Sequence, residues 1–149
     1  MGRVENTSAK RAVWVYGVAA ILSLIGLLDA LYLTIEHLTG QSVRCTVTAG
    51  CSEVLSSSYA TIAGVPLAAF GALAYFTAFS LATLAAFGQR RPRPLFALLA
   101  AIMAAMSLWL LFVQAFVLHH FCQYCLLSAI ISFSLAALAV VARVTRVSS

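Results

Sequence analysis

The sequence predicts an all-α membrane protein: a bundle of four transmembrane helices with both termini in the cytoplasm and a long extracytoplasmic loop between the first two helices. Three observations predict this fold class. Of 149 residues, 63% are hydrophobic and 9% are charged, whereas soluble domains carry roughly 25% charged and 45–50% apolar residues. The apolar residues fall into four long runs, and the positive charges gather on one side of them. The length fits one domain, residues 1–149.

The four runs are expected to form helices over about 12–35, 65–87, 95–118 and 122–142. Each is long enough to cross a bilayer, which takes about 20 apolar residues. The first run is too long for the apolar part of a signal peptide, roughly 7–15 residues, so we expect a retained helix. Asp29 lies near its outer end, where a solvated or hydrogen-bonded structural carboxylate is favoured over a functional one.

The basic residues set the expected orientation. With four spans, both termini and the link between the second and third helices share one side. Arg44 alone lies on the opposite side, and positive charge accumulates on the cytoplasmic side of a membrane. The link at 37–64 and the corner at 119–122 are therefore expected to face outward, with all four cysteines. The residues on the cytoplasmic side are Arg3, Lys10, Arg11, Arg90, Arg91, Arg93, Arg143 and Arg146.

Cys122 and Cys125 form a C-x-x-C pair where the fourth helix is expected to begin. Positions i and i+3 share one helix face, so the two sulfurs can pair. The partial positive charge of a helix N-terminus favours a thiolate. Lipid-soluble oxidants can reach this position from the membrane. The simpler alternative is a static disulfide or an unreactive buried thiol.

Cys45 and Cys51 lie in the outward link, separated by small residues and Gly50. Such a loop can bring two Cα atoms within the disulfide range of about 4.4–6.8 Å. The pair could be a structural staple, but closing so short a loop stabilises little. Thiol–disulfide exchange proceeds through a mixed disulfide. A relay needs one pair accessible to a protein and a second pair near the final acceptor, and the sequence supplies both.

Three other classes of protein are compared with this relay. A soft-metal protein could use the four thiolates with His37, His119 and His120, but the spacing of Cys45 and Cys51 does not match a zinc knuckle. The nine basic residues form no stripe with interleaved aromatic residues, so nucleic acid is not expected. A non-catalytic membrane protein with structural disulfides is the remaining alternative.

The cysteines and their surroundings resemble the vitamin K epoxide reductase family in its short bacterial form, over nearly the whole chain. The residues that carry the resemblance are Leu31-Tyr32-Leu33, Cys45, the segment from Cys51 to Ser57, Gly64-Val65-Pro66, Phe70-Gly71, Tyr75 and the segment from Phe121 to Cys125. Two positions differ from the vertebrate enzymes, which have Asn and Tyr where Leu67 and Ala129 stand here. This difference argues against vitamin K epoxide as the substrate.

The resemblance implies a role for each cysteine. Cys45 would form the mixed disulfide with a partner protein, Cys51 would pass reducing equivalents to Cys122, and Cys125 would face a quinone. A short helix after Cys51 would cap the quinone pocket, supported by Ser56 or Ser57. Phe70, Phe112 and Phe116 are candidate quinone contacts, although ordinary helix packing is the simpler interpretation of these three.

The resemblance also implies the activity. The protein would be a quinone-dependent protein-disulfide oxidoreductase of the inner (plasma) membrane, with its redox-active cysteines on the extracytoplasmic side. Its quinone would be a menaquinone or ubiquinone. Since many bacterial relatives carry a fused thioredoxin-like domain and this chain ends at Ser149, the expected partner is a separate thioredoxin-like or DsbA-like exported protein. Its net product would be new disulfides in exported proteins.

Overall fold

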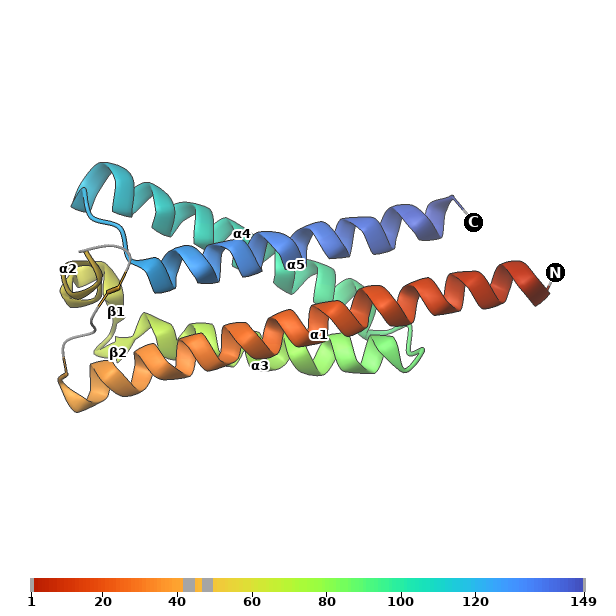
Figure 1. Cartoon of the computed structure of the whole chain (residues 1–149), viewed down its shortest axis with the longest axis horizontal. Coiled ribbons are helices and arrows are strands. Elements are labelled where there is room, and N and C mark those ends of the chain that lie inside the picture. Colours follow the sequence, from red (N-terminus) through yellow and green to blue (C-terminus); the bar gives the residue numbers. More distant parts are fainter. Residues whose placement is uncertain (1, 42–44, 47–49, 149) are drawn as a thin grey trace.

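A computed structural model describes residues 2–41, 45–46 and 50–148 of the chain (Figure 1). Four long helices dominate it. In chain order the elements are α1 (Gly2–Thr39), α2 (Cys51–Ser56), the 3₁₀ turn η1 (Ser58–Ala60), β1 (Thr61–Ile62), β2 (Val65–Pro66), α3 (Leu67–Ala86), α4 (Pro92–Phe112), the π-helical η2 (Val113–Leu118) and α5 (Gln123–Val147).

The four predicted spanning helices are present, and each is long and apolar enough to cross a membrane. Their ends differ from the predicted ones. Helix α1 begins at Gly2 instead of residue 12, because its polar first turns project exposed side chains while the helical hydrogen bonds continue. Helix α4 begins at Pro92 instead of residue 95, because proline suits the first turn of a helix, where its missing N–H is not needed. The apolar run underestimates the length of these two helices, whereas α3 is shorter than the predicted 65–87 because Val65–Pro66 form β2.

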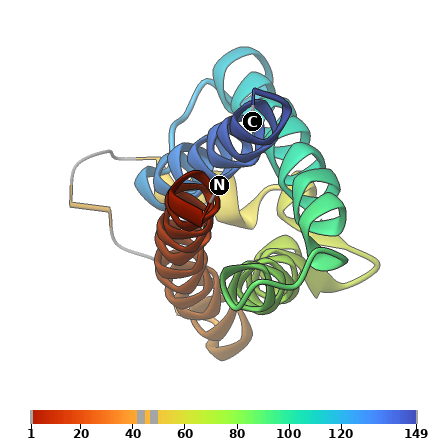
Figure 2. The same ribbon diagram turned by 90° about the vertical axis from the view of Figure 1, so that its right-hand side faces the viewer.

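The bundle has two distinct ends (Figure 1). Both termini lie at one end, and α2, β1 and β2 lie at the other. Figure 2 looks along the bundle from the end that carries the termini, with the long helices surrounding the axis. Helix α1 packs against α3 and α5, and α4 packs against the same two helices. Fully buried alanines such as Ala19, Ala78 and Ala82 allow this close approach.

Large apolar side chains cover the outside of the bundle, including Ile21, Leu73, Leu98 and Ile130, each more than half exposed. A soluble surface does not carry so many, whereas lipid accommodates them. The chain is therefore a multi-pass membrane protein. Of the charges used to predict its orientation, Arg44 lies outside the described residues.

The corner between η2 and α5 reverses the chain at the end that carries α2. The last turns of the third span change from α-helix to the π-helical η2. His119 then adopts the left-handed conformation with φ 54°, which is uncommon for a residue other than glycine. The extended Cys122 (φ −100°, ψ 122°) follows as the N-cap of α5. π-helical turns are frequent at functional sites, and this one leads directly to a cysteine pair.

Candidate active site

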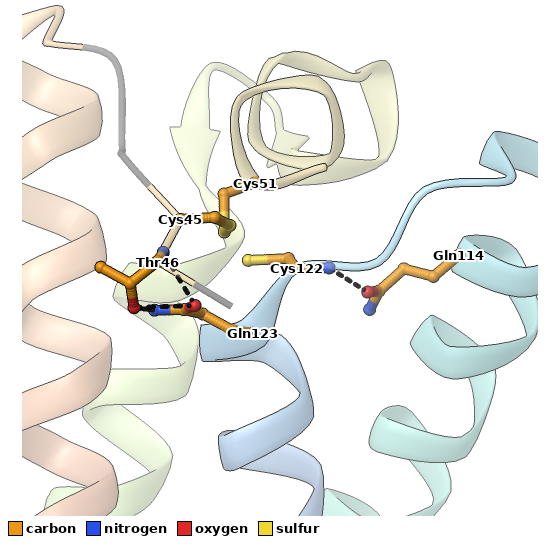
Figure 3. Close-up of a disulfide and its surroundings, with 6 residues drawn as sticks. All are labelled: Cys45, Thr46, Cys51, Gln114, Cys122 and Gln123. Atoms are coloured by element: carbon orange, nitrogen blue, oxygen red, sulfur yellow. Dashed lines mark hydrogen bonds between the residues drawn. A yellow bond between two sulfur atoms is a disulfide. The ribbon is translucent and has the colours of Figure 1, made fainter. Parts of the chain in front are cut away.

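The four cysteines lie together at the end of the bundle that carries α2. Cys51 and Cys122 are buried in one cluster with Leu33 and Val54, and Cys45 and Cys125 pack against that cluster. Cys45 and Cys51 form a disulfide with a Cα–Cα distance of 5.6 Å, while Cys122 and Cys125 are free thiols. In Figure 3 the side chain of Cys122 points toward the disulfide. The fold thus places a buried thiol against a disulfide formed by residues far away in the sequence.

The position of Cys51 depends on a close approach at Gly50. A Cβ added at Gly50 would lie 2.8 Å from the Phe121 carbonyl oxygen and 2.9 Å from the Phe121 nitrogen. Real Cβ atoms do not approach backbone atoms this closely, so glycine is required here. In the first turn of α2, Glu53 pairs with His120, whose Nε2 lies 2.6 Å from a Glu53 carboxylate oxygen. Both contacts hold α2 against the corner that precedes Cys122.

A buried glutamine fixes the backbone at Cys122. The Cys122 N–H donates a hydrogen bond to Gln114 Oε1 at 3.0 Å (Figure 3). Gln114 belongs to η2 and is only 2% exposed. The first N–H groups of a helix and of its N-cap have no partner within that helix. Gln114 supplies one, so the third span determines where the reactive end of α5 lies.

A second amide fixes the loop on the other side of the disulfide. The backbone N–H of Thr46 donates to Gln123 Oε1 at 3.1 Å, and the Thr46 hydroxyl lies 3.3 Å from both amide atoms of Gln123. Gln123 is the residue that follows Cys122 in the C-x-x-C segment. The residue after Cys45 is thereby tied to the residue after Cys122, which keeps the two cysteine pairs adjacent (Figure 3).

The surroundings of Cys122 favour its thiolate. A hydrogen bond from the Cys125 side chain lowers the pKa of Cys122 to about 7, and the backbone N–H groups of Cys125 and Tyr124 add to this effect. Burial and the negative charge of Asp29 oppose it. A thiolate, and not a thiol, is the nucleophile in disulfide exchange. Cys122 therefore has both the orientation and the charge to attack the neighbouring disulfide.

An apolar cavity of about 410 Å³ lies inside the bundle, next to the cysteines. This volume is within the range of small-molecule sites, about 300–1,000 Å³. Cys125 forms part of its wall. Within the second cysteine pair, Cys122 therefore faces the disulfide and Cys125 faces the cavity. The wall comes from α1, α2, η1, β1, β2, α3, α4, η2 and α5, and includes Asp29, Leu67, Phe70, Met103, Gln114 and Ser128.

Only some of the residues predicted to contact a quinone line this cavity. Ser57, Phe70 and Cys125 line it, whereas Ser56, Phe112 and Phe116 are not among the described residues of its wall. The short helix expected after Cys51 is present as α2. At its end the Ser57 hydroxyl donates to the Val54 carbonyl at 2.6 Å, and exposed Ser56 lies 3.4 Å from the Glu53 carbonyl.

Phe112 and Phe116 lie elsewhere on the bundle. Their ring centroids are 4.9 Å apart, and the side chains are 50% and 68% exposed on the outer surface of the third span. A hydrophobic residue at a helix position in an all-apolar run can face either lipid or the bundle interior. Quinone contact stays a prediction for all six residues, including Ser57, Phe70 and Cys125, which line the cavity.

Gln114 was not predicted from the sequence, and Gly50 was predicted only to help close the Cys45–Cys51 loop. The signal for Gln114 was a lone amide inside the apolar run 95–118, where polar residues are costly and usually functional. The signal for Gly50 was a glycine directly before a cysteine, but its necessity depends on Phe121, which is distant in the sequence. Across the described ranges 2–41, 45–46 and 50–148, no group of three or more His, Cys, Asp or Glu side chains is placed to hold a metal ion.

A dithiol whose buried member, Cys122, lies beside a disulfide at one end of a four-helix membrane bundle is suited to thiol–disulfide exchange in a membrane. The comparison with known proteins agrees with that class. Residues 18–140 match the model of the vitamin K epoxide reductase family, and the chain belongs to this family.

One curated relative is the thiol-disulfide oxidoreductase LTO1 of Arabidopsis thaliana. It is 36% identical over 123 aligned residues, with 76% of this chain and 33% of the relative covered. The chain thus spans about a third of the length of this relative.

Proposed function

We propose that this protein is a membrane thiol–disulfide oxidoreductase that reoxidises a thioredoxin-like or DsbA-like exported protein and passes the electrons to a membrane quinone. The observation that carries the proposal is the position of the second cysteine pair. Cys122 is buried against the Cys45–Cys51 disulfide, while Cys125 lines an apolar cavity. The Cys122–Cys125 pair is thus placed to exchange electrons with the Cys45–Cys51 pair and with a membrane-soluble ligand in the cavity.

The first transfer takes two electrons from the partner protein. A partner thiolate attacks Cys45, which forms a mixed disulfide and releases Cys51 as a thiolate. Cys51 then attacks Cys122 of an oxidised Cys122–Cys125 pair and releases Cys125. The second partner thiol displaces Cys45 and leaves the partner oxidised. Finally Cys45 attacks Cys51, which restores the first disulfide and releases Cys122. The second pair is now a dithiol, which is the pairing state in the structure.

The cavity residues fit a quinone as the final acceptor. Leu67, Phe70 and Met103 supply apolar walls for a ring, and Ser57 and Ser128 supply hydroxyl groups. A quinone bound there would accept two electrons and two protons and leave as a quinol. The role of Cys122 and Cys125 is to supply both electrons as they form their disulfide. The family makes a menaquinone or ubiquinone the expected substrate.

The proposed orientation follows from charge. The basic residues of the termini and of the α3–α4 link lie at the end away from the cysteines. By the preference of positive charge for the cytoplasmic side, both termini are cytoplasmic and the cysteines extracytoplasmic. In an inner (plasma) membrane this places the Cys45–Cys51 disulfide where exported proteins fold, so the net product is new disulfides in those proteins.

The direct test is quinone reduction by the purified protein with a reduced thioredoxin-like protein as donor, followed by quinone absorbance. Cys125→Ala should abolish turnover, because it removes the sulfur that faces the cavity. Ser80→Ala is a matched control, since Ser80 only bonds the Phe76 carbonyl of its own helix and should leave turnover unchanged. Wild-type turnover in the Cys125→Ala protein would overturn the proposal.

A second test separates a relay from a structural staple. In cells, Cys51→Ala should accumulate a disulfide between Cys45 and an exported protein, because the resolving sulfur is absent. A protein with both Cys45→Ala and Cys51→Ala should form no such adduct. If alkylating mass tags find Cys45 and Cys51 fully oxidised in wild type and no adduct in Cys51→Ala, the disulfide is structural and the relay is excluded.

A further inference from the structure

We propose that Asp29 is the proton-transfer residue of the cavity: its carboxylate takes the proton of the Cys125 thiol and gives it to an oxygen of the quinone. This inference rests on the proposed function and assigns a new role within the same site. Sequence analysis favoured a structural role for Asp29, because a carboxylate near the end of a spanning helix is commonly solvated. The structure instead places it in the wall of the cavity.

The positions of Asp29 and Cys125 bring a carboxyl and a thiol to one cavity. Asp29, Leu33 and His37 line it from α1 at spacings of four residues, which places them on one helix face. Cys125 and Ser128 line it from α5, which packs against α1. A molecule in this cavity that touches Cys125 therefore has Asp29 in the same wall.

No structural partner accounts for the Asp29 carboxylate. Among the residues that the structure describes, neither a hydrogen bond nor an ion pair to it is present. The Tyr75 hydroxyl, on the α3 helix that packs against α1, bonds Ser128 Oγ at 2.7 Å and Ser132 Oγ at 3.1 Å instead. An acidic side chain inside a spanning helix is costly and is usually retained for function.

The step balances with water as the donor of the second proton. The Asp29 carboxylate accepts the proton of the Cys125 thiol, and Cys125 becomes a thiolate like Cys122. As the two thiolates form the Cys122–Cys125 disulfide, two electrons pass to the quinone. One quinone oxygen takes the proton from Asp29, and the other takes a proton from water, which leaves as hydroxide. The products are one disulfide, one quinol, one hydroxide and the original carboxylate.

Other titratable groups lie in the cavity wall or interact with Asp29 from outside it, and they contribute to a pH profile. His37 of α1, Tyr59 of η1 and Cys125 of α5 line the cavity, while the described part of α4 contributes no charged group to the wall. Tyr75 and Cys122 are outside the wall but interact electrostatically with Asp29. His37 lies two helical turns from Asp29, toward the end that carries α2, and is the other group of α1 that can exchange a proton with the cavity.

The first experiment measures oxidation of the Cys122–Cys125 dithiol in a single turnover. The full-length protein is placed in lipid nanodiscs with a short-chain ubiquinone or menaquinone. Asp29→Asn, which keeps size but cannot carry the proton, should slow this step about 100-fold, the typical size of an acid–base contribution. Asp29→Glu should recover part of the rate. Glu36→Gln, on the same helix but outside the cavity wall, should change nothing.

The second experiment needs no quinone. Asp29 is the single aspartate of the chain, so ¹³C-labelled aspartate reports on this carboxyl alone in an infrared difference spectrum between dithiothreitol-reduced and oxidised protein. We expect the protonated-carboxyl band to change on reduction. A rate of Cys51–Cys122 exchange equal to that of wild type will show that Asp29→Asn is correctly folded.

The inference would be overturned if Asp29→Asn reduced quinone at the wild-type rate. It would also be overturned if the aspartate band were the same in the reduced and the oxidised protein. If the wild type reduces no quinone while the band still responds, the quinone step of the proposed function is overturned, and proton exchange between Asp29 and the cysteine pair stands. The two failures are therefore distinguishable.

Discussion

The backbone of Gly50 lies so close to the backbone of Phe121 that no side chain fits between them: a Cβ on Gly50 would be 2.8 Å from the Phe121 carbonyl oxygen. This contact joins the start of α2 to the corner before α5. It therefore sets the separation between Cys51 and Cys122, the two sulfurs that must meet in the proposed relay.

Gly50→Ala should weaken contact between Cys51 and Cys122. The added methyl must displace backbone, and such overpacking costs about 1–3 kcal/mol. With Cys45→Ala and Cys125→Ala also present, Cys51 and Cys122 are the remaining cysteines, and oxidation joins them. We expect a lower yield of this disulfide on non-reducing gels when Gly50→Ala is added.

Two comparisons make the Gly50 test specific. Gly17→Ala adds the same methyl where nothing lies within 4 Å, and it should leave the yield unchanged. Glu53→Gln removes the pair with His120, but both side chains are half exposed, and exposed ion pairs contribute at most about 1 kcal/mol. Its effect should therefore be smaller than that of Gly50→Ala. An undiminished yield with Gly50→Ala would show that α2 moves freely against the corner.

Gln114→Leu should lower the thermal stability of the protein. It leaves the Cys122 N–H without the acceptor that now lies 3.0 Å away, and a buried unsatisfied donor costs about 1–3 kcal/mol. The thermal unfolding midpoint in detergent measures the effect. Gln89→Leu, on the exposed link before α4, is the matched control. Equal midpoints for the two variants would mean that another group satisfies Cys122.

The alkylation rate of Cys122 should rise through pH 7 in the reduced protein. Its pKa is lowered to about 7, below the ordinary cysteine value of about 8.5, so the thiolate predominates above pH 7 and the rate levels off there. Mass spectrometry of the labelled peptide after pulses of iodoacetamide gives the profile. Cys125→Ala removes the largest cause of the shift and should move the midpoint to higher pH. A midpoint that Cys125→Ala leaves in place would contradict this origin.

Phe70→Ala should raise the KM for quinone, because Phe70 is the predicted aromatic contact that lines the cavity. Phe112→Ala and Phe116→Ala test the other two candidates separately. Their side chains pack against each other on the outer surface of the third span, so the cavity predicts a smaller effect for each. Steady-state quinone reduction measures all three. A larger KM change for Phe112→Ala than for Phe70→Ala would place the quinone outside this cavity.

The sequence by itself determined that four helices are long and apolar enough to span a membrane, because hydrophobicity over about 20 residues is a local property. It also identified both cysteine pairs, and the residues around them indicated the family that the comparison then showed. The sequence did not predict that α1 starts at Gly2, because helical hydrogen bonds continue beyond the apolar run.

Only the tertiary structure decided which side chains face one another. In a helix that is apolar all round, periodicity does not separate the face toward lipid from the face toward the cavity, so Phe70 and Phe112 were indistinguishable in the sequence. For the same reason the sequence did not reveal the hydrogen bond from Cys122 to Gln114 or the position of Asp29 in the cavity wall. Each depends on the packing of helices that are distant in the chain, and no local pattern encodes that packing.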